Sequence, residues 1–509
     1  MRKGNAGGPR SPAGPALSAV ALILGASCGS GEYFAVREPD LSAALDRYFE
    51  AVMESRPMPG LAAAVVKGGR VIYAKGFGVR ALGTSDPVTP ETVFHTASVS
   101  KAFVATAAMR LVGEGRLDLD APATRYVPHF RLADGRENEI IIRQILSHTS
   151  GMPDVLDYGW ETPEYDAEAL ERYVRSLSNQ RLLSDPGTTW KYSNMAYEVM
   201  GDILARIEQL PFEEVIAAGI LTPLEMRHSS FLPFEHPGGD QAVPHRGSLS
   251  PVRAAVYPYH RAHAPSSTLR SNALDLARFA IAMLESNRPL LADSLKQLMW
   301  TSQADVDREL RMGFGWFLRS HRRATMVLAP GRDPGFNAMV ALLPEQEVGV
   351  VLLSNYDGQS AFELVEVADG VLDIGLGRSP ALPKASIAIP VARVLATSGM
   401  DAAIAEYRRL RAADDPRYQA GMSDLITLGH DLRQTGRLDD AIRFYQLNAE
   451  EQPEYFASHL ALAQAFLLKG DTTRAVASYR TMLSLNPERF GCPESCYRDE
   501  RLRALAQVR

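Results

Sequence analysis

The sequence is poor in cysteine and has no excess of basic residues. Its 509 residues include only 3 cysteines, and 54 Lys and Arg stand against 60 Asp and Glu, which gives a net charge of -6. Proteins that bind nucleic acid or anionic membrane surfaces carry clusters of basic residues, and no such cluster follows the N-terminal segment. A nucleic-acid partner is therefore not expected. The apolar fraction of 46% and the charged fraction of 22% are typical of a globular protein with two or three domains.

Long apolar runs are also missing. The run at 16–26 follows Arg2, Lys3 and Arg10 and is too short to span a bilayer. Residues 1–35 are therefore predicted to be an export signal of a bacterial periplasmic or secreted protein. Small residues precede Cys28, as in bacterial lipoproteins, so lipidation of Cys28 and membrane attachment are one expectation. Signal cleavage nearby, which leaves a soluble protein, is an equal alternative.

The other cysteines lie near the C-terminus. Cys492 and Cys496 are four residues apart in the predicted tail, 491–509. They are expected to form a disulfide in an oxidising compartment. A zinc site needs more ligands than these two thiols, and no others are close in the sequence. We therefore predict no metal and no cofactor.

Residues 36–374 show the pattern of an α+β domain. A helix is expected at 40–58, followed by a β-hairpin whose strands are 60–66 and 71–78. Further strands and helices are predicted toward the end of the domain: strands at 313–317, 336–343 and 348–355, and helices at 272–284 and 361–372. Strands at both ends with helices between them predict one antiparallel sheet, whose first and last strands meet, beside a helical lobe.

After a linker at 375–390, rich in Pro, Ala and Ser, the pattern is helical and repeats over 391–490. Residues recur thirty-four positions apart: Leu428 and Leu462, Gly436 and Gly470, Ala441 and Ala475, Tyr445 and Tyr479, Pro453 and Pro487. This is the tetratricopeptide period, and Val391 to Arg411 is interpreted as a divergent first unit. The aromatic residues are expected to serve mainly in packing: Phe444, Tyr445, Phe466 and Tyr479. A protein partner is one expectation for the module.

The chain contains one S-x-x-K motif, Ser98 to Lys101, followed by helical apolar spacing. Ser98 is thus placed at a helix start, with Lys101 one turn further on. Lysine can take the serine proton only where burial or nearby positive charge keeps its amine neutral. The motif alone favours a structural interpretation, with Ser98 as an N-cap and Lys101 as a solvated helix residue.

The chain also contains one Y-x-N motif, Tyr192 to Asn194. With Ser98 and Lys101 it resembles the serine β-lactamase and penicillin-binding-protein superfamily, specifically the class C β-lactamase-related branch with its carboxypeptidases and esterases. The resemblance covers about residues 40 to 372. It includes further landmarks: Leu146 to Gly151, Leu274 to Phe279, Gly313 to Trp316 and Asp333 to Phe336.

The resemblance assigns roles to these residues. It implies a β-lactamase-like fold in which Ser98 is the nucleophile, Lys101 its base and Tyr192 the proton relay. Asn194 would orient Lys101 and the substrate amide. The oxyanion donors would be the nucleophile's own N–H and a strand near Phe336 to Ala338. Substrate contacts are accordingly expected from Asn194, Gly331, Phe336 and Asn337.

The third motif departs from the family pattern. Where the family carries K-T-G or H-x-G, this chain has Ala329-Pro330-Gly331. Arg322, Arg323 or Arg332 could replace the missing cation. The H-x-G strings at His236 and His245 are interpreted as loop residues. Without a cation, no evident group would bind a substrate carboxylate. The sequence therefore favours a neutral ester or amide as the substrate over a β-lactam or a D-alanyl peptide.

Two further polar residues are given structural interpretations. His148 could form a triad with Ser98, but its helix-end context favours a structural cap, and Asp275 is interpreted as a surface residue of a helix. The sequence therefore predicts a serine hydrolase that acts through an acyl-enzyme on Ser98, with esterase, D-Ala-D-Ala carboxypeptidase-like or β-lactamase-like activity. The competing hypothesis is a catalytically weak binding protein whose helical repeats recruit a partner.

Overall fold

The structure, a computed structural model, describes residues 38–233, 240–247, 251–286, 290–358, 363–413 and 415–485. The predicted export signal, Cys28, His236, Cys492, Cys496 and the C-terminal tail lie outside this range. The predictions made for them therefore stay predictions. Across the described ranges, no helix is both long and apolar enough to cross a membrane.

Helices and strands are interspersed along the chain as far as residue 419, and helices follow in the described residues after it. The helices are α1 (Glu38–Ser55), α2 (Ser100–Gly113), α3 (Ile142–Leu146), α4 (Ala169–Ser176), α5 (Asn194–Glu208), α6 (Phe212–Ile216), α7 (Ala264–Ser267), α8 (Ala273–Leu284), α9 (Asp293–Met299), α10 (Val365–Gly375), α11 (Ala388–Ser398), α12 (Met400–Ala413), α13 (Asp424–Gln434), α14 (Leu438–Glu451), α15 (Phe456–Leu468) and α16 (Thr472–Ser484). The strands are β1 (Gly60–Lys67), β2 (Arg70–Gly78), β3 (Phe94–His95), β4 (His245–Arg246), β5 (Val252–Arg253), β6 (Arg270–Ser271), β7 (Ala304–Asp305), β8 (Arg311–Met312), β9 (Phe317–His321), β10 (Ala324–Asp333), β11 (Phe336–Leu343), β12 (Val348–Ser354), β13 (Ala385–Ser386) and β14 (Tyr418–Gln419).

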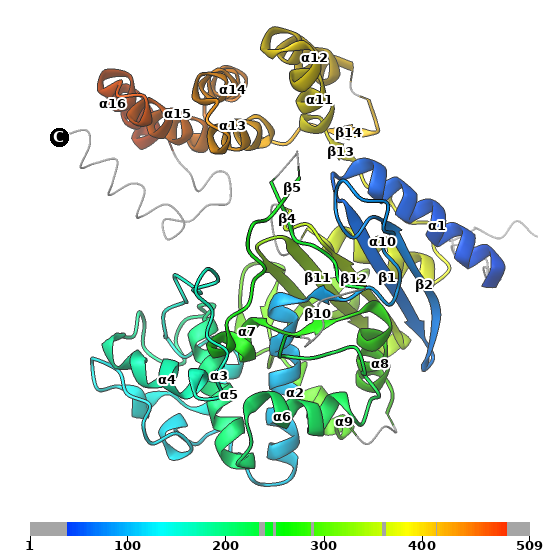
Figure 1. The fold of residues 1–509 in the computed structure, drawn as a ribbon, viewed down its shortest axis with the longest axis vertical. Helices are drawn as coiled ribbons and strands as arrows, with labels where there is room; N and C mark the ends of the chain where they lie inside the picture. The colour runs from blue at the N-terminus through cyan, green and yellow to red at the C-terminus, as the bar shows by residue number, and fades with distance from the viewer. Residues whose placement is uncertain are drawn as a thin grey trace, which may run out of the picture. The chain divides into compact units, whose positions relative to one another are not determined.

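An antiparallel sheet forms the centre of the first domain (Figure 1). Within the described residues it has eight strands, in the order β2-β1-β12-β11-β10-β9-β8-β7. The first strand, β1, pairs with β12 from Leu61 opposite Ser354 to Lys67 opposite Val348. The predicted meeting of the first and last strands is therefore confirmed, as are the β1–β2 hairpin and the strands at β11 and β12.

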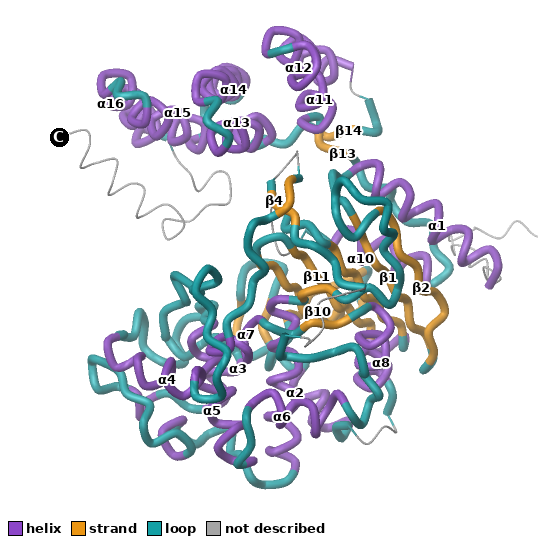
Figure 2. The backbone as a smooth tube through the Cα atoms, viewed as in Figure 1, coloured by secondary structure: helices purple, strands orange, loops and turns teal. Residues whose placement is uncertain are grey.

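Both faces of the sheet are covered, as the sequence of β1 requires. Successive side chains of a strand point to opposite faces, and every residue of β1 before Lys67 is buried. Ala62, Ala64 and Val66 join the core that contains α2 and α8, whereas Leu61, Ala63 and Val65 join the core that contains α1 and α10. Figure 2 shows the strands gathered between these helices.

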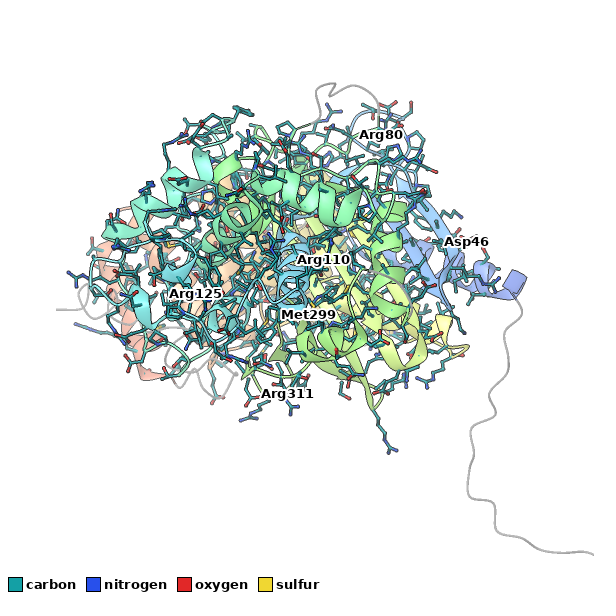
Figure 3. All side chains as sticks on the ribbon, turned by 90° about the horizontal axis from the view of Figure 1, so that it is seen from below. Asp46, Arg80, Arg110, Arg125, Met299 and Arg311 are labelled. Carbon is teal, nitrogen blue, oxygen red and sulfur yellow. The ribbon has the colours of Figure 1, made fainter. Side chains whose placement is uncertain are left out.

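The helical lobe is packed around α2 and α5. Arg110 lies on α2, near the middle of the view in Figure 3, and its guanidinium group donates to the carbonyl oxygen of Gly219. Gly201 on α5 approaches α7 so closely that a Cβ added there would lie 2.1 Å from Pro265 Cγ. This close approach brings α5, α7 and α2 together at the end of the sheet where Ser98 lies.

The prediction of a strand at 313–317 is wrong for most of that segment. Gly313 to Trp316 form a turn, and β9 begins only at Phe317. Gly315 has a φ of +76°, and a Cβ there would lie 2.4 Å from the Cβ of Ala105 on α2. Gly315 therefore allows this turn to cross α2 at close range, which an extended strand could not do.

The C-terminal helices form antiparallel pairs that follow the predicted period of thirty-four residues. Gly436 ends the α13–α14 turn with a φ of +78°, and Gly470 ends the α15–α16 turn with a φ of +79°. Ala441 and Ala475 are both fully buried between helices. An all-α module is therefore observed, preceded by the α11–α12 pair. α11 begins inside the predicted linker, because a proline in the first turn of a helix, here Pro390, is compatible with helical structure.

Candidate active site

Ser98, the predicted nucleophile, lies in a short helical turn, η1 (Ala97–Val99), directly before α2. The preceding residue, Ala97, has a φ of +49°, which is a strained conformation for a residue other than glycine. Thr96 holds the turn in place, since its N–H donates to the carbonyl oxygen of Leu269 over 2.8 Å. The turn thus holds the partly buried Ser98 at the helix start, as the sequence predicted.

Ser98, Lys101 and Tyr192 form one hydrogen-bonded cluster. Ser98 Oγ lies 3.0 Å from Lys101 Nζ and 2.9 Å from the hydroxyl oxygen of Tyr192. Lys101 Nζ also donates to the carbonyl oxygen of Ser266 over 2.7 Å. It lies 5.0 Å from the centre of the Tyr192 ring. The structure therefore brings together the three residues for which the sequence predicted catalysis.

The pKa of Lys101 is suitable for a general base. Its side chain is almost completely buried, and this burial lowers the pKa of Lys101 to about 8, although nearby carboxylates act in the opposite direction. Burial raises the pKa of Tyr192, and its hydrogen bond to Ser98 opposes that shift. Near pH 8 the amine is therefore neutral in about half of the molecules, while Tyr192 keeps its proton.

His148 positions the loop that carries Tyr192. Its carbonyl oxygen accepts from the N–H of Lys191 over 2.7 Å, and its Nδ1 accepts from the N–H of Ser193 over 3.1 Å. Its ring stacks on that of Tyr192 at 4.2 Å. Burial lowers the pKa of His148 well below its usual value. No hydrogen bond joins His148 to Ser98 among the described residues, which agrees with the structural role predicted for it.

Asn194 is held by a carboxylate rather than by Lys101. Its backbone N–H and its Nδ2 each donate to Asp154 Oδ1 over 2.8 Å. Its Oδ1 is buried and has no hydrogen-bond partner in the described part of the chain. Because a buried acceptor without a partner is costly, this oxygen is a suitable acceptor for an N–H of a bound substrate. The expected Asn194–Lys101 hydrogen bond is not formed.

The strand that approaches the turn of Ser98 most closely is β10, rather than β11, which begins at Phe336. A Cβ on Gly331 would lie 2.2 Å from Thr96 O and 3.1 Å from Ser98 N, so β10 approaches η1 as closely as backbone allows. Phe336 on β11 packs its ring against His95 and Tyr257, at 5.7 and 5.3 Å. Asn337 is buried and pairs with Arg332 of β10 and Ser354 of β12. The backbone N–H of Ser98 is therefore approached most closely by β10, whereas the predicted oxyanion strand was near Phe336 to Ala338.

Of the cations proposed to replace the third motif, Arg322 and Arg332 are engaged elsewhere and Arg323 is distant from Gly331 along β10. Arg322 and Arg323 lie in the turn before β10, about 25 Å along the strand from Gly331, and Arg322 binds Asp373. Arg332 is nearer, but its Nε donates to the carbonyl oxygen of Asp357 over 2.6 Å. His245 is not a loop residue: it is buried in β4, and its ring bonds the backbone of Asn355 and Leu82.

Three carboxylates act on Lys101, and sequence reasoning missed this role for all of them. Glu198, Asp154 and Asp333 each raise the pKa of Lys101 against the effect of burial. Asp333 accepts from His95 Nε2 over 2.7 Å and from the hydroxyl of Ser267. Glu198 lies four residues after Asn194 in a helical pattern, and this spacing was the one available signal.

The prediction that Asp275 is a surface residue is also wrong. It is completely buried and accepts hydrogen bonds from the N–H of His228 and the hydroxyl of Ser229. Arg278 pairs with its other oxygen. The sequence showed only a polar residue in the first turn of a helix, which is typical of an exposed position. The loop that covers it comes from a distant segment. Asp275 therefore anchors that loop on α8.

The arrangement of fold and site defines the class of protein. An antiparallel sheet beside a helical lobe, with Ser98, Lys101 and Tyr192 at the end of β10, is the arrangement of a hydrolase of the β-lactamase fold. The chain belongs to the Beta-lactamase family, whose model matches residues 45–370.

The chain is also similar to curated relatives and to solved structures. Protein flp of Staphylococcus aureus (strain N315) is 27% identical over 332 residues, which cover 64% of this chain and 66% of flp. Esterase EstB of Burkholderia gladioli is 32% identical over 320 residues, which cover 56% of this chain and 80% of EstB. The octameric penicillin-binding protein homologue from Pyrococcus abyssi matches with a TM-score of 0.58 and 26% identity, over 70% of this chain and 81% of that one. EstCE1, a hydrolase with promiscuous acyltransferase activity, matches with a TM-score of 0.56 and 22% identity, over 66% and 98% of the two chains.

Proposed function

We propose that the protein is a serine hydrolase that forms an acyl-enzyme on Ser98 and acts on an ester or an amide without a free carboxylate. One observation carries the proposal: Ser98 Oγ lies within hydrogen-bond distance of both Lys101 Nζ and the Tyr192 hydroxyl. A serine becomes a nucleophile when a neighbouring base can accept its proton. Lys101 meets that need, since burial brings its pKa to about 8.

The reaction takes place in two steps. In the first, Ser98 Oγ attacks the substrate carbonyl carbon, and its proton passes to the Lys101 amine. When the tetrahedral intermediate collapses, the bond to the leaving group breaks, and the leaving oxygen or nitrogen takes a proton from Tyr192, which recovers it from Lys101. In the second, water attacks the acyl carbonyl and gives a proton to the same pair; the bond between the carbonyl carbon and Ser98 Oγ then breaks, and Ser98 Oγ takes that proton as the acid leaves.

The oxyanion of each tetrahedral intermediate requires hydrogen-bond donors. We expect the backbone N–H of Ser98 to be one donor, because it faces the closest approach of β10 at Gly331. A backbone N–H of β10 beside Gly331 would be the second. In this arrangement residue 331 must be a glycine, because any Cβ there would displace the turn that holds Ser98.

The charges around Ser98 favour substrates without a carboxylate. Asp154, Glu198 and Asp333 all act on Lys101, and the guanidinium group of Arg332 is engaged by backbone carbonyls. A carboxylate at this position would face negative charge without a paired cation. The printed name of EstB, an esterase that shares 32% identity with this chain, supports the same choice over D-alanyl peptides and β-lactams.

The proposal is tested by labelling and turnover in the full chain. We expect a fluorophosphonate to add one adduct to the wild-type protein and none to Ser98→Ala, as measured by intact mass. Hydrolysis of short-chain p-nitrophenyl esters should exceed that of nitrocefin and of D-alanyl-D-alanine peptides. If Ser98→Ala retained wild-type turnover, or if the wild-type protein took up no adduct, a binding protein without turnover would be the better description.

A further inference from the structure

Glu198 is a completely buried carboxylate that is linked to Lys101 through Ser266. It lies on α5, which follows Tyr192 and Asn194, and its exposed fraction is 0%. Its Oε1 accepts from the Ser266 hydroxyl over 2.5 Å and lies 3.2 Å from His263 Nδ1. Its Oε2 has no hydrogen-bond partner within the described residues. An ionisable group with a free buried oxygen lowers stability, so its presence calls for a function.

One residue, Ser266, connects Glu198 to Lys101. Ser266 donates its hydroxyl proton to Glu198 and offers its carbonyl oxygen to Lys101 Nζ, 2.7 Å away. A neutral lysine amine that donates to this carbonyl directs its lone pair elsewhere, and Ser98 Oγ lies 3.0 Å from the same nitrogen. The position of Ser266 therefore decides whether the lone pair faces the Ser98 hydroxyl. Glu198 holds Ser266 at the end of α7 through its hydroxyl.

A second buried carboxylate on α5 shows that these contacts are not a general feature of the helix. Asp202 lies one turn after Glu198, is also buried, and pairs with His129 Nε2 over 2.7 Å. None of its hydrogen bonds reaches Ser98, Lys101 or Ser266 in the described structure. Asp202 is therefore on the same helix as Glu198, is also buried and also pairs with a histidine, His129 instead of His263, but it has no link to Lys101.

We propose that Glu198 is a positioning residue of the hydrolase, which fixes the Ser266 carbonyl beneath Lys101 and stabilises the positive charge that Lys101 gains when it takes the Ser98 proton. The inference rests on the proposed function, because a base for Ser98 matters only if Ser98 reacts. It adds a residue that the S-x-x-K and Y-x-N motifs do not contain.

Other charged and titratable groups surround the pair and enter the expected pH dependence. Those that act on Lys101 besides Glu198 are Asp154 from the loop after α3 and Asp333 from β10. Those that face Glu198 besides Lys101 are His263 at the start of α7, Tyr173 from α4 and Tyr158. Tyr192, Tyr197 and His148 also lie against Lys101. Burial raises the pKa of Glu198, and its hydrogen bonds to His263 and Ser266 oppose that shift. In Glu198→Gln all of these groups remain, and the carboxylate is replaced by a neutral amide of similar shape.

The test compares kcat/KM against pH for p-nitrophenyl ester hydrolysis in the full chain, for wild type, Glu198→Gln and Asp202→Asn. Removing the negative charge beside Lys101 lowers its pKa, so the acid limb of Glu198→Gln should move to lower pH by about one unit or more. The acid limb of Asp202→Asn should coincide with that of wild type. A purely structural role for Glu198 would lower the plateau of Glu198→Gln and leave its acid limb at the wild-type pH.

A third variant separates position from charge and does not depend on the folding of Glu198→Gln. Ser266→Ala keeps the carboxylate and removes the hydroxyl that Glu198 holds. Its plateau of kcat/KM should fall by about tenfold, while its acid limb stays at the wild-type pH. A plateau within twofold of wild type would overturn the positioning role, with about twofold as the limit of measurement.

The outcomes distinguish this inference from the proposed function. If the wild-type protein takes up no adduct that depends on Ser98, both fail. If it does, and the acid limb of Glu198→Gln matches that of Asp202→Asn, the stabilising charge of Glu198 is refuted while the serine hydrolase stands. If the limb moves and Ser266→Ala lowers the plateau, both roles of Glu198 are supported.

Discussion

The candidate active site and the C-terminal helix pairs are built in opposite ways. The candidate active site gathers polar groups from segments far apart in the chain, such as Ser98, Tyr192 and Ser266, and joins them by hydrogen bonds through Ser98 and Lys101. The helix pairs α13–α14 and α15–α16 bury small and apolar residues at a fixed interval, with Ala441 and Ala475 at equivalent positions. In the candidate active site a small displacement should therefore affect chemistry, and in the helix pairs it should affect stability.

The largest effect is expected when Lys101 is replaced. Lys101→Ala removes the base that accepts the Ser98 proton, so kcat/KM for an activated ester should fall by about 1,000-fold. Lys296 is a matched control: it is equally buried, and its Nζ donates to the carbonyl oxygens of Ala282 and Glu285. Lys296→Ala should lower the melting temperature and leave kcat/KM nearly unchanged. Equal losses of activity in the two variants would contradict a specific role for Lys101.

Gly331→Ala should give the next largest effect. The added Cβ would lie 2.2 Å from Thr96 O, so either β10 or the nucleophile turn must move. A shift of about 1 Å at a reacting group costs about 100-fold in rate. We expect kcat/KM to fall by about that factor while the protein still folds, as measured by ester hydrolysis and circular dichroism. An unchanged rate would show that the oxyanion donors lie away from Gly331.

In the helix pairs, enlarging a buried alanine should change stability without changing the rate. Ala475 is fully buried on α16, and Ala475→Leu forces α15 and α16 apart at a cost of about 1–3 kcal/mol. Hydrogen exchange of the α15 and α16 amides should become faster, whereas kcat/KM stays constant. Ala477 is exposed on the same helix, so Ala477→Leu should leave exchange within about 0.5 kcal/mol of wild type.

The pH dependence of the reaction should separate the two regions further. Lys101 acts as a base only when its amine is neutral, and burial places its pKa at about 8. Protonation at lower pH removes the base, so kcat/KM should fall about tenfold for each pH unit well below 8 and level off above it. Hydrogen exchange of α13–α16, corrected for its intrinsic pH dependence, should report constant stability across the same range. A rate independent of pH between 6 and 9 would argue against Lys101 as the base.

The smallest effect is expected at the turns of the helix pairs. Gly436 has a φ of +78° and no atom within 4 Å of a Cβ added there, so Gly436→Ala meets backbone strain but no clash. The cost should be about 1 kcal/mol, seen in local hydrogen exchange, with unchanged hydrolysis. Gly436→Asn should lose less, because asparagine tolerates the left-handed region. Equal losses of stability in the two variants would mean that the added side chain, and not the backbone angle, sets the cost.

Local pattern predicted much of the fold. The hairpin of β1 and β2, the strands β11 and β12 and the paired C-terminal helices follow from alternation, turn residues and period, all of which are local properties of the chain. The strand at Gly313 to Phe317 was wrong, because Gly315 makes a close crossing over α2. Periodicity does not reveal whether a glycine serves a strand or a contact with a distant helix.

The candidate catalytic residues were predicted from two motifs and from the family that these motifs resemble, whereas their surroundings were not predicted. By itself the sequence determined that Ser98 and Lys101 lie one helical turn apart and that Tyr192 and Asn194 flank the start of α5. Only the tertiary structure decided that β10 borders the nucleophile, that Asp275 is buried, and that Glu198 reaches Lys101 through Ser266. The physical reason is that burial and charge depend on partners from distant segments, whereas helical spacing depends on neighbours in the chain.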